Sequence, residues 1–372
     1  MAAPRRPTML DVAARAGVSR ALVSIVFRDR PGASERTRAR VLAAAEELGY
    51  RPDGAARLLA RGRSRTVGVV TTVGEPYEAD MLESIYDEAA RLGYDVLLSA
   101  RTPTHPEADA VEGLLAHRCE ALVLLGPTLG DTALTALAGR TTVALVGRAA
   151  PAGEAMDSLR TADDVGLRQA VDHLVGLGHR AVAHVDGGDG PNAGVRRDGY
   201  RDAMAAHGLG ASARVLDGGY DEQAGIAAAR ALLDAPDPPT AVVAANDRCA
   251  LGLLDTLRRS GVDVPGTLSV VGYNDDRLAR LAHVDLTTVR QDAGALARGA
   301  VRAVATRLDD TTATPEDRLL PRTWWSGERP HPRPAPAGDH GSGSRTAGCG
   351  RVPSRSVITG SLSGRSRWSR SR

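Results

Sequence analysis

The chain has 372 residues, 42% of them hydrophobic, which is enough for two or three folding units with buried cores. Its net charge of +2 is unevenly spread, because residues 1–65 carry 14 arginines against 6 acidic residues, residues 66–328 carry 24 against 38, and residues 329–372 carry 9 against 1. A basic head on an acidic body is typical of a DNA-binding module joined to a domain that does not bind DNA, since attraction to phosphates is wanted at one end only.

Two further features of the composition argue against whole classes of protein. There is no run of about 18 apolar residues that would span a membrane, and the N-terminus lacks the apolar segment of a signal peptide, so we expect a cytoplasmic protein. Cys119, Cys249 and Cys349 are widely spaced, which indicates neither a disulfide framework nor a CxxC metal site. We therefore expect no metal ion and no cofactor.

Residues 8–27, TMLDVAARAGVSRALVSIVF, predict two short helices joined by a tight turn. Thr8 and Asp11 have the spacing of a capping box, so the first helix should begin near Met9, and Gly17 provides the positive φ that ends it. The expected apolar face of this helix consists of Leu10, Val12, Ala13 and Ala16.

The second helix should begin after Ser19, which is a good N-cap. Val23, Val26 and Phe27 recur at i, i+3 and i+4 and should face inward. The outer face is the candidate DNA-reading surface, where a long donor can reach a guanine edge and an apolar side chain a thymine methyl group. Its residues are Arg20, Ala21, Ser24 and Ile25. An ordinary helical hairpin is the alternative, because short apolar periodicity alone would favour it.

A third helix and a linker complete the first 65 residues. Ser34 should cap the helix and Gly49 should end it. The expected packing face consists of Val41, Leu42, Ala45 and Leu48. A short segment from Asp53 to Ala60 follows, which is too small to be a stable helix alone. At the other end, residues 1–7 form a basic arm that either contacts phosphates or is a frayed terminus.

From Thr66 onward, predicted strands alternate with predicted helices, which indicates parallel α/β units. The first unit has strands VGVVTT, DVLLSA, ALVLLG and TVALVG, with helices around Met81–Leu92 and Glu107–His117 and a further helix before the last strand. The second unit has strands AVAHVD, AVVAAN and SVVGYN and one near Val215, with helices at Asp164–Leu177, Arg196–His207, Glu222–Leu233 and Arg248–Ser260. Two lobes with facing strand ends would form a cleft that closes on a small ligand.

Polar and aromatic residues near the strand ends are the candidate ligand contacts. Amides, carboxylates and arginines offer the donors and acceptors that sugar hydroxyls require, and an aromatic ring can stack on the apolar face of a sugar. These candidates are Tyr77, Arg148, Tyr220, Asn246, Asp247, Asn274, Asp275 and Gln291. For Asp247 and Asp275 the alternative is that each serves only to cap the helix that follows.

Three stretches, TMLDVAARAGVS, SERTRARVLAAAEELGYRPDGAARLL and SRTVGVV, resemble the head of the lac-repressor family of bacterial transcription regulators. The later motifs GHRAVAHVDGG, AANDRCALG, SVVGYNDD and DLTTVRQ extend the resemblance to about Leu320. The resemblance implies an all-α helix-turn-helix head at residues 1–50 and a hinge helix with linker at 51–65. It also implies an α/β two-lobed, periplasmic-binding-protein-like effector domain with parallel sheets at residues 66–327.

The resemblance further implies how the two lobes divide the chain. The first lobe is expected at about residues 66–158 and 292–314, and the second at about 159–291 and 315–327. Each lobe would therefore be built from more than one segment.

Single residues also acquire roles from this resemblance. Arg196, in RRDGY, matches the family's ligand-binding arginine, whose planar fork can hold vicinal hydroxyls or a carboxylate. Leu59 matches the leucine that wedges into a minor-groove step of the operator, although a plain linker with an incidental leucine is the alternative. Asn274 stands where an aspartate is usual, which removes a charge-assisted bond to a sugar. The implied DNA contacts are Thr8, Ser19, Arg20, Ala21, Ser24, Ile25, Arg28, Arg57 and Leu59.

Together these features predict a homodimeric transcription regulator, a repressor, that binds a palindromic double-stranded DNA operator and responds to a small sugar or sugar derivative. A cytoplasmic sugar-binding protein without a regulatory role is the alternative. An enzyme is not predicted, because Gly187, Gly188 and Gly190 lack the GxGxxG spacing and no P-loop, HExxH or GxSxG motif occurs.

The resemblance stops at Leu320, where family members usually continue with a sequence such as LPPHLVVRGAT and this chain reads LPRTWWSGERP. When PRTWWSGERP is written in GC-rich codons and one cytosine is inserted near the start, the reading frame shifts. The new codons encode PPHLVVRGAT. Residues 328–372 are therefore predicted to be a disordered basic tail read out of frame, with Trp324 and Trp325 in the place of Leu and Val. A genuine basic tail that adds affinity for phosphates is the alternative.

Overall fold

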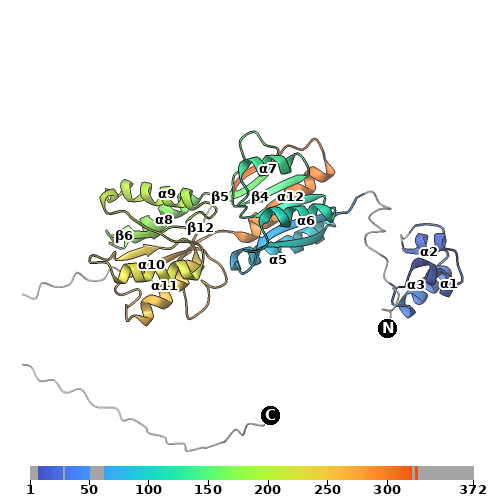
Figure 1. Ribbon diagram of the computed structural model, residues 1–372, viewed down its shortest axis with the longest axis horizontal. Coiled ribbons are helices and arrows are strands. Elements are labelled where there is room, and N and C mark those ends of the chain that lie inside the picture. Colours follow the sequence, from blue (N-terminus) through green and yellow to red (C-terminus); the bar gives the residue numbers. More distant parts are fainter. Residues whose placement is uncertain (1–6, 28–29, 51–62, 321–322, 326–372) are drawn as a thin grey trace, which may run out of the picture. The chain divides into compact units, whose positions relative to one another are not determined.

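The computed structural model describes residues 7–27, 30–50, 63–320 and 323–325. These residues form a small helical head and a domain of two α/β lobes (Figure 1). Among the helices that the structure describes, none combines the length and the hydropathy that crossing a bilayer requires.

The head consists of helices α1 (Met9–Ala16), α2 (Arg20–Phe27) and α3 (Glu35–Glu47). The predicted start of α1 is confirmed, because the Thr8 backbone N–H donates to Asp11 Oδ2 at 2.7 Å. The carboxylate of this residue therefore satisfies a donor at the positive end of the helix.

Three further helix ends of the head are also formed as predicted: the end of α1 and the starts of α2 and α3. Gly17 has a φ of 61° and ends α1 in the left-handed conformation. Ser19 Oγ accepts from the Leu22 N–H at 3.2 Å, and Ser34 Oγ accepts from the Thr37 N–H at 3.3 Å. Each serine supplies a partner for an otherwise unpaired N–H in the first turn of its helix.

The prediction that Leu10 and Leu42 face the core of the head is wrong. Leu10 is 62% exposed and Leu42 is 48% exposed. The buried stripe of α1 runs through positions 9, 12, 13 and 16, and that of α3 through 41, 44, 45 and 48, so each leucine lies one residue, or about 100°, away from its stripe. Val12, Val23 and Val41, one from each helix, are fully buried and form the centre of the core.

The first lobe is a six-stranded sheet in the order β11-β5-β4-β3-β1-β2, and all neighbours are parallel. Its strands are β1 (Thr66–Thr72), β2 (Asp95–Arg101), β3 (Ala121–Leu125), β4 (Thr142–Val146), β5 (Asp157–Thr161) and β11 (Asp317–Leu320). Its helices are α5 (Pro76–Leu92), α6 (Glu107–Ala116), α7 (Asp131–Ala138) and α12 (Ala293–Asp309).

The second lobe has a six-stranded sheet in the order β12-β10-β9-β8-β6-β7, parallel except for the β10–β12 pair. Its strands are β6 (Val182–Val185), β7 (Arg214–Leu216), β8 (Ala241–Val243), β9 (Ser269–Asn274), β10 (Thr288–Arg290) and β12 (Thr323–Trp325). Its helices are α8 (Asp163–Gly176), α9 (Ala193–Ala206), α10 (Glu222–Leu233) and α11 (Asp247–Arg259), with a short 3₁₀ turn at Gly210–Ser212.

Helices cover both faces of each sheet, as parallel strands require. Along β3, Ala121, Val123 and Leu125 pack with α5 and α12, whereas Leu122 and Leu124 pack on the opposite side with α6 and α7. This alternation follows from the two-residue period of a strand. In the second lobe, α10 and α11 pack on one face of the sheet and α8 and α9 on the other.

Among the described strands, the chain crosses from one lobe to the other three times, after β5, after β10 and after β11. The predicted lobe boundaries need correction here. Residues 159–161 belong to β5 and residues 317–320 to β11, and both strands pair in the sheet of the first lobe. Because β5 and β11 pair with each other across more than 150 residues of sequence, local patterns do not reveal where the chain crosses.

The other predicted strands and helices are present, and most boundaries agree within two or three residues. The helix predicted around Met81–Leu92 begins earlier, at Pro76, where the missing N–H of proline is harmless. The long helix α12 was not predicted as an element, although residues 292–314 were expected in the first lobe.

Several predictions fall outside the described residues. These are the hinge segment Asp53–Ala60 with Arg57 and Leu59, the DNA contact Arg28, Cys349, and the tail 328–372. Trp324 and Trp325 lie in β12, whose backbone pairs with β10 so that Trp324 is opposite Val289 and Trp325 is opposite Thr288.

Candidate functional site

The outer edge of α2 presents the predicted DNA-reading residues. Arg20 and Ala21 are exposed, and Ser24 and Ile25 are half-buried. Their positions follow the spacing of one helical face, on the side opposite the buried Val23 and Val26. A face of this kind can enter a groove while the inner face stays packed on the head.

A second site lies between the two lobes, where a cavity of about 230 Å³ is lined by residues of both. Six of the predicted ligand contacts lie together on its wall: Tyr77, Arg196, Tyr220, Asn246, Asn274 and Gln291. Three others, Arg148, Asp247 and Asp275, do not line this cavity.

Arg196 is the buried cation of the second-lobe wall. Its Nε donates to Asp163 Oδ1 at 2.8 Å and its Nη1 to the Ala245 carbonyl at 2.6 Å. The guanidinium carbon also lies 3.8 Å from the ring centroid of Tyr273 and 5.4 Å from that of Tyr220. Two of the guanidinium nitrogens, Nε and Nη1, are thus already bonded within the fold. In the described part of the chain, Nη2 is the nitrogen without a hydrogen bond.

Neutral polar groups surround this arginine. Asn246 caps α11 by accepting from the Cys249 N–H at 2.8 Å, and it donates to the Tyr220 carbonyl at 2.8 Å. Gln291 donates to Asn274 Oδ1 at 2.5 Å and accepts from the Thr161 hydroxyl at 2.8 Å. These bonds fix the orientations of the amides, which preorganises the wall for a polar ligand.

The first-lobe wall contributes three charged residues that the sequence analysis missed: Glu75, Glu78 and Arg101. Glu78 accepts from the Thr72 N–H at 2.6 Å and from the Thr71 hydroxyl at 2.9 Å, and burial raises its pKa. Arg101 donates to Thr72 Oγ1 at 2.7 Å. A signal for Arg101 was available, because it is the last residue of β2 and strand ends line such clefts.

Glu75 joins the two lobes at the edge of the cavity. Its Oε2 lies 3.1 Å from Arg248 Nη1, whereas Oε1 is buried and has no hydrogen-bond partner within the described ranges. Burial outweighs the attraction of Arg248 and raises the pKa of Glu75 to about 7. A hydroxyl or amine of a ligand would give Oε1 the donor that it lacks.

The three predicted contacts outside the cavity have partners of their own. Arg148 Nη2 lies 2.6 Å from Asp131, and Asp275 Oδ2 lies 2.9 Å from Arg280 Nη2. Asp247 accepts from the Thr288 hydroxyl at 2.6 Å and from the Asp276 N–H at 2.9 Å.

Asp247 is fully buried, and burial with the nearby charge of Asp276 raises its pKa to about 7. The alternative that Asp247 caps α11 is not what the structure has, because Asn246 is the N-cap. Its carboxylate instead ties α11 to the ends of β9 and β10.

Further polar contacts hold the lobes together around the cavity. Arg277 Nε donates to Asp80 Oδ1 at 2.8 Å, and Asn192 Nδ2 donates to the Gly147 carbonyl. In the described ranges, no group of His, Cys, Asp or Glu side chains is arranged to hold a metal ion. The arrangement can therefore enclose a small polar molecule and bind it from two sides.

Two family models match the chain. Residues 8–53 match "Bacterial regulatory proteins, lacI family", and residues 171–328 match "Periplasmic binding protein-like domain". The chain is 35% identical over 318 residues to the HTH-type transcriptional regulator GalR of Escherichia coli (strain K12), an alignment that covers 83% of this chain and 91% of that protein.

Solved structures agree with these matches. A lac repressor dimer bound to operator and the anti-inducer ONPF is similar with a TM-score of 0.76 and 28% identity, over 88% of this chain and 99% of that one. A complex of the transcriptional regulator CelR with cellobiose is similar with a TM-score of 0.62 and 30% identity, over 87% of this chain and 99% of that one.

Proposed function

This chain belongs to the lacI family of bacterial regulatory proteins, and we propose that it represses transcription under the control of a small sugar-like effector. The observation that carries the proposal is the interlobe cavity, whose polar wall is built around Arg196, in a chain that also has a helix-turn-helix head. The head binds the operator and the cavity binds the effector.

The DNA side of the proposal rests on the exposed edge of α2 and on the basic charge of the head. The similar lac repressor is a dimer bound to operator, and we propose the same for this chain. A homodimer would place two recognition helices in major grooves about one helical turn apart, which requires a palindromic double-stranded site.

The effector side rests on the chemistry of the cavity wall. Asn246, Asn274 and Gln291 are neutral hydrogen-bonding groups, and Tyr220 offers an aromatic ring beside Arg196. Hydroxyl groups match such amides, and Glu75 Oε1 is a further acceptor. The similar CelR structure holds cellobiose, which supports a sugar or sugar derivative as the effector class.

Communication between the two sites requires only a modest coupling. A ligand that contacts both walls favours the arrangement in which Glu75 meets Arg248 and Asp80 meets Arg277. A coupling of ~1–3 kcal/mol would change operator affinity by about 5- to 150-fold.

The experiment uses the full chain in two steps. Selection from random DNA duplexes should return a two-fold symmetric site, and a thermal-shift screen with mono- and disaccharides should identify a sugar that also changes affinity for that site. Recovery of no symmetric site from the selection would overturn the proposal.

A sugar-binding protein without a regulatory role is the second candidate. It would bind a sugar in the same screen but select no duplex. We propose a cytoplasmic regulator rather than an enzyme, since the similar proteins are transcription regulators.

A further inference from the structure

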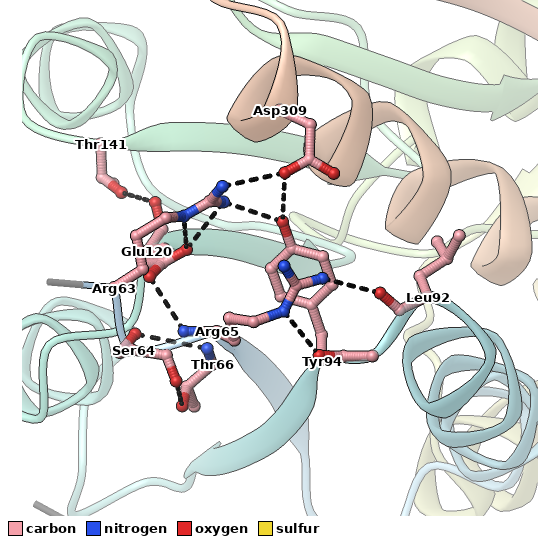
Figure 2. Close-up of polar contacts among 10 residues, drawn as sticks. Arg63, Ser64, Arg65, Thr66, Leu92, Tyr94, Glu120, Thr141 and Asp309 are labelled. Atoms are coloured by element: carbon pink, nitrogen blue, oxygen red, sulfur yellow. Dashed lines mark hydrogen bonds and ion pairs between the residues drawn. The ribbon is translucent and has the colours of Figure 1, made fainter. Parts of the chain in front are cut away.

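A cluster of polar contacts holds Arg63, which lies in the linker segment 51–65 and is the first residue of that segment that the structure describes (Figure 2). Its Nη1 lies 2.9 Å from Asp309 Oδ1, and its Nη2 lies 3.0 Å from the Tyr94 hydroxyl and 3.1 Å from Glu120 Oε2. Nε also donates to Glu120 Oε2 at 3.2 Å. The guanidinium is therefore held from three parts of the first lobe at once: the residue before β2, the residue before β3 and the end of α12.

Arg65 reinforces this anchor two residues later. Its backbone N–H donates to Glu120 Oε1 at 2.9 Å, and its side chain donates to the carbonyls of Leu92 and Gly93 at 2.9 and 2.8 Å. The guanidinium carbon also lies 4.5 Å from the ring centroid of Tyr94. The cationic side chain therefore satisfies carbonyls at the C-terminal end of α5, where a positive charge is favoured.

The ion pair between Arg63 and Asp309 contributes too little to the stability of the fold for stability to be its main role. The side chain of Arg63 is 41% exposed and that of Asp309 is 57% exposed. Ion pairs with this exposure contribute little to folding because water and salt screen them. What the contacts with Asp309, Glu120 and Tyr94 do provide is a fixed position and direction for the residue at which the linker joins the lobe.

Asp309 is also the last residue of α12, whose other end lies at the cavity. Leu296, in the first turn of α12, lines the cavity, and so does Gln291 just before the helix. Asp292 fixes the start of the helix by accepting from the Ala295 N–H at 2.8 Å. With 17 residues, α12 spans about 25 Å from the cavity to Arg63.

The body of α12 is packed as one rigid piece. Leu296, Ala300 and Val304, spaced by four residues, are fully buried against the sheet of the first lobe. On its other side, Arg302 Nε donates to Glu88 Oε1 on α5 at 2.7 Å. A shift at its cavity end must therefore move its far end as well, since packed helices move as units.

We propose that α12 couples the effector cavity to the linker, and that the Arg63–Asp309 pair is the point at which this coupling reaches the DNA-binding head. The inference rests on the proposed function and adds to it a route for the signal. Arg63 and Asp309 are positioning residues in this scheme, because they act by fixing the linker and need no contact with the effector or the DNA.

The test is a double-mutant cycle on operator affinity with full-length protein and no effector, using the duplex that the wild-type chain selects. Gln291→Ala removes the bonds to Thr161 and Asn274 at the cavity end of α12. It is combined with Arg63→Gln or with Asp309→Asn at the far end. Glu112→Gln is the matched control, because Glu112 lies on α6, on the sheet face opposite α12, and pairs with Arg140 at 2.8 Å on the surface of the same lobe.

We expect Gln291→Ala to change operator affinity by about threefold or more in the wild-type and Glu112→Gln backgrounds. In the Arg63→Gln and Asp309→Asn backgrounds the same substitution should change it by less than about twofold, since the signal no longer reaches the linker. Thermal unfolding of each variant checks that the lobes still fold, and Arg63→Lys, which keeps the charge, should recover part of the coupling.

Equal effects of Gln291→Ala in all backgrounds, including no effect in any, would overturn this inference and leave the proposed function standing. If the wild-type chain selects no duplex, the proposed function fails and this inference fails with it.

Discussion

Arg196 Nε lies 2.8 Å from Asp163 Oδ1, and both side chains are buried. Asp163 also accepts from the Tyr273 hydroxyl at 2.7 Å, so the arginine, the aspartate and the tyrosine form one network behind the cavity wall. Arg196, which matches the family's ligand-binding arginine, is therefore also part of the core of the second lobe. For substitutions at Arg196 or Asp163, the effect on ligand binding must be measured separately from the effect on stability.

Asp163→Ala should lower the free energy of unfolding by about 3–5 kcal/mol, because it leaves a buried guanidinium without its carboxylate. Urea unfolding followed by circular dichroism measures this change. Asp255→Ala is the control, since Asp255 pairs with Arg259 at the surface and its loss should cost less than about 1 kcal/mol. Equal losses for the two variants would contradict the buried-pair argument.

Arg196→Lys keeps a cation beside Asp163 but removes the planar fork and the Nη2 nitrogen. We expect effector affinity to fall by about 1.5–3 kcal/mol, the contribution of a hydrogen bond to a charged group. Titration calorimetry with the sugar found in the screen measures the change. Operator affinity without that sugar should stay at the wild-type value. An unchanged sugar affinity would show that Arg196 does not bind the effector.

Glu75 gives the two-lobed domain a pH dependence. Because its pKa rises from 4.5 to about 7 on folding, the neutral acid is favoured in the folded state, and the folded state loses stability as the pH increases through this window. The loss attributable to Glu75 is about 3 kcal/mol at most. Asp247, whose pKa is also raised to about 7, adds to the same slope.

Glu75→Gln separates the two contributions, since glutamine resembles the neutral acid and does not titrate. Unfolding free energies measured between pH 4.5 and 7 should show a shallower slope for this variant than for the wild type. An identical slope would mean that Glu75 is ionised throughout the window, with Arg248 outweighing burial.

Arg20→Ala should weaken operator binding by ~1–3 kcal/mol and relax the preference at one base position per half-site. The reason is its place as the first exposed residue after the Ser19 cap. Arg15→Ala is a suitable control, because Arg15 pairs with Glu47 and joins α1 to α3 away from the reading face. A uniform loss over all sequences for Arg20→Ala would indicate a phosphate contact instead.

The frame after Leu320 can be tested directly. We expect resequencing of the gene near codon 321 to restore PPHLVVRGAT after one added base. The intact mass of the protein expressed from its native source would then differ from that of the present chain. A confirmed frame, together with a tail that resists proteolysis in the purified protein, would rule the frameshift out.

Local patterns predicted most elements, and the reasons for success and failure are physical. The helix Glu222–Leu233 was predicted with its observed bounds, because Asp221 caps it and its apolar residues keep a helical period. The lobe boundaries were misplaced because β5 and β11 are defined by pairing with each other, which no local pattern reports. Arg148 was placed in the site because it ends a strand, but an ion pair with Asp131 holds it elsewhere.

The cavity wall was only half predictable for a similar reason. Asn246, Asn274 and Gln291 are polar residues at strand ends in the second lobe, a position that sequence reveals. Both glutamates on the first-lobe side stand at the start of α5. Glu78 is buried among Thr71 and Thr72 of its own lobe, whereas Glu75 is buried against Arg248 of the opposite lobe. Burial between two lobes is a property of the folded chain and has no local signature.

The three crossings between the lobes have a consequence for how the protein is made. The sheet of the first lobe lacks its covering helix α12 until Asp309 has been synthesised, and it lacks the edge strand β11 until Leu320. By then the ribosome has already produced every element of the second lobe except β12. Until then this sheet face is covered by α5 without α12, so we expect a chain that terminates early to leave apolar surface of the first lobe exposed and prone to aggregation.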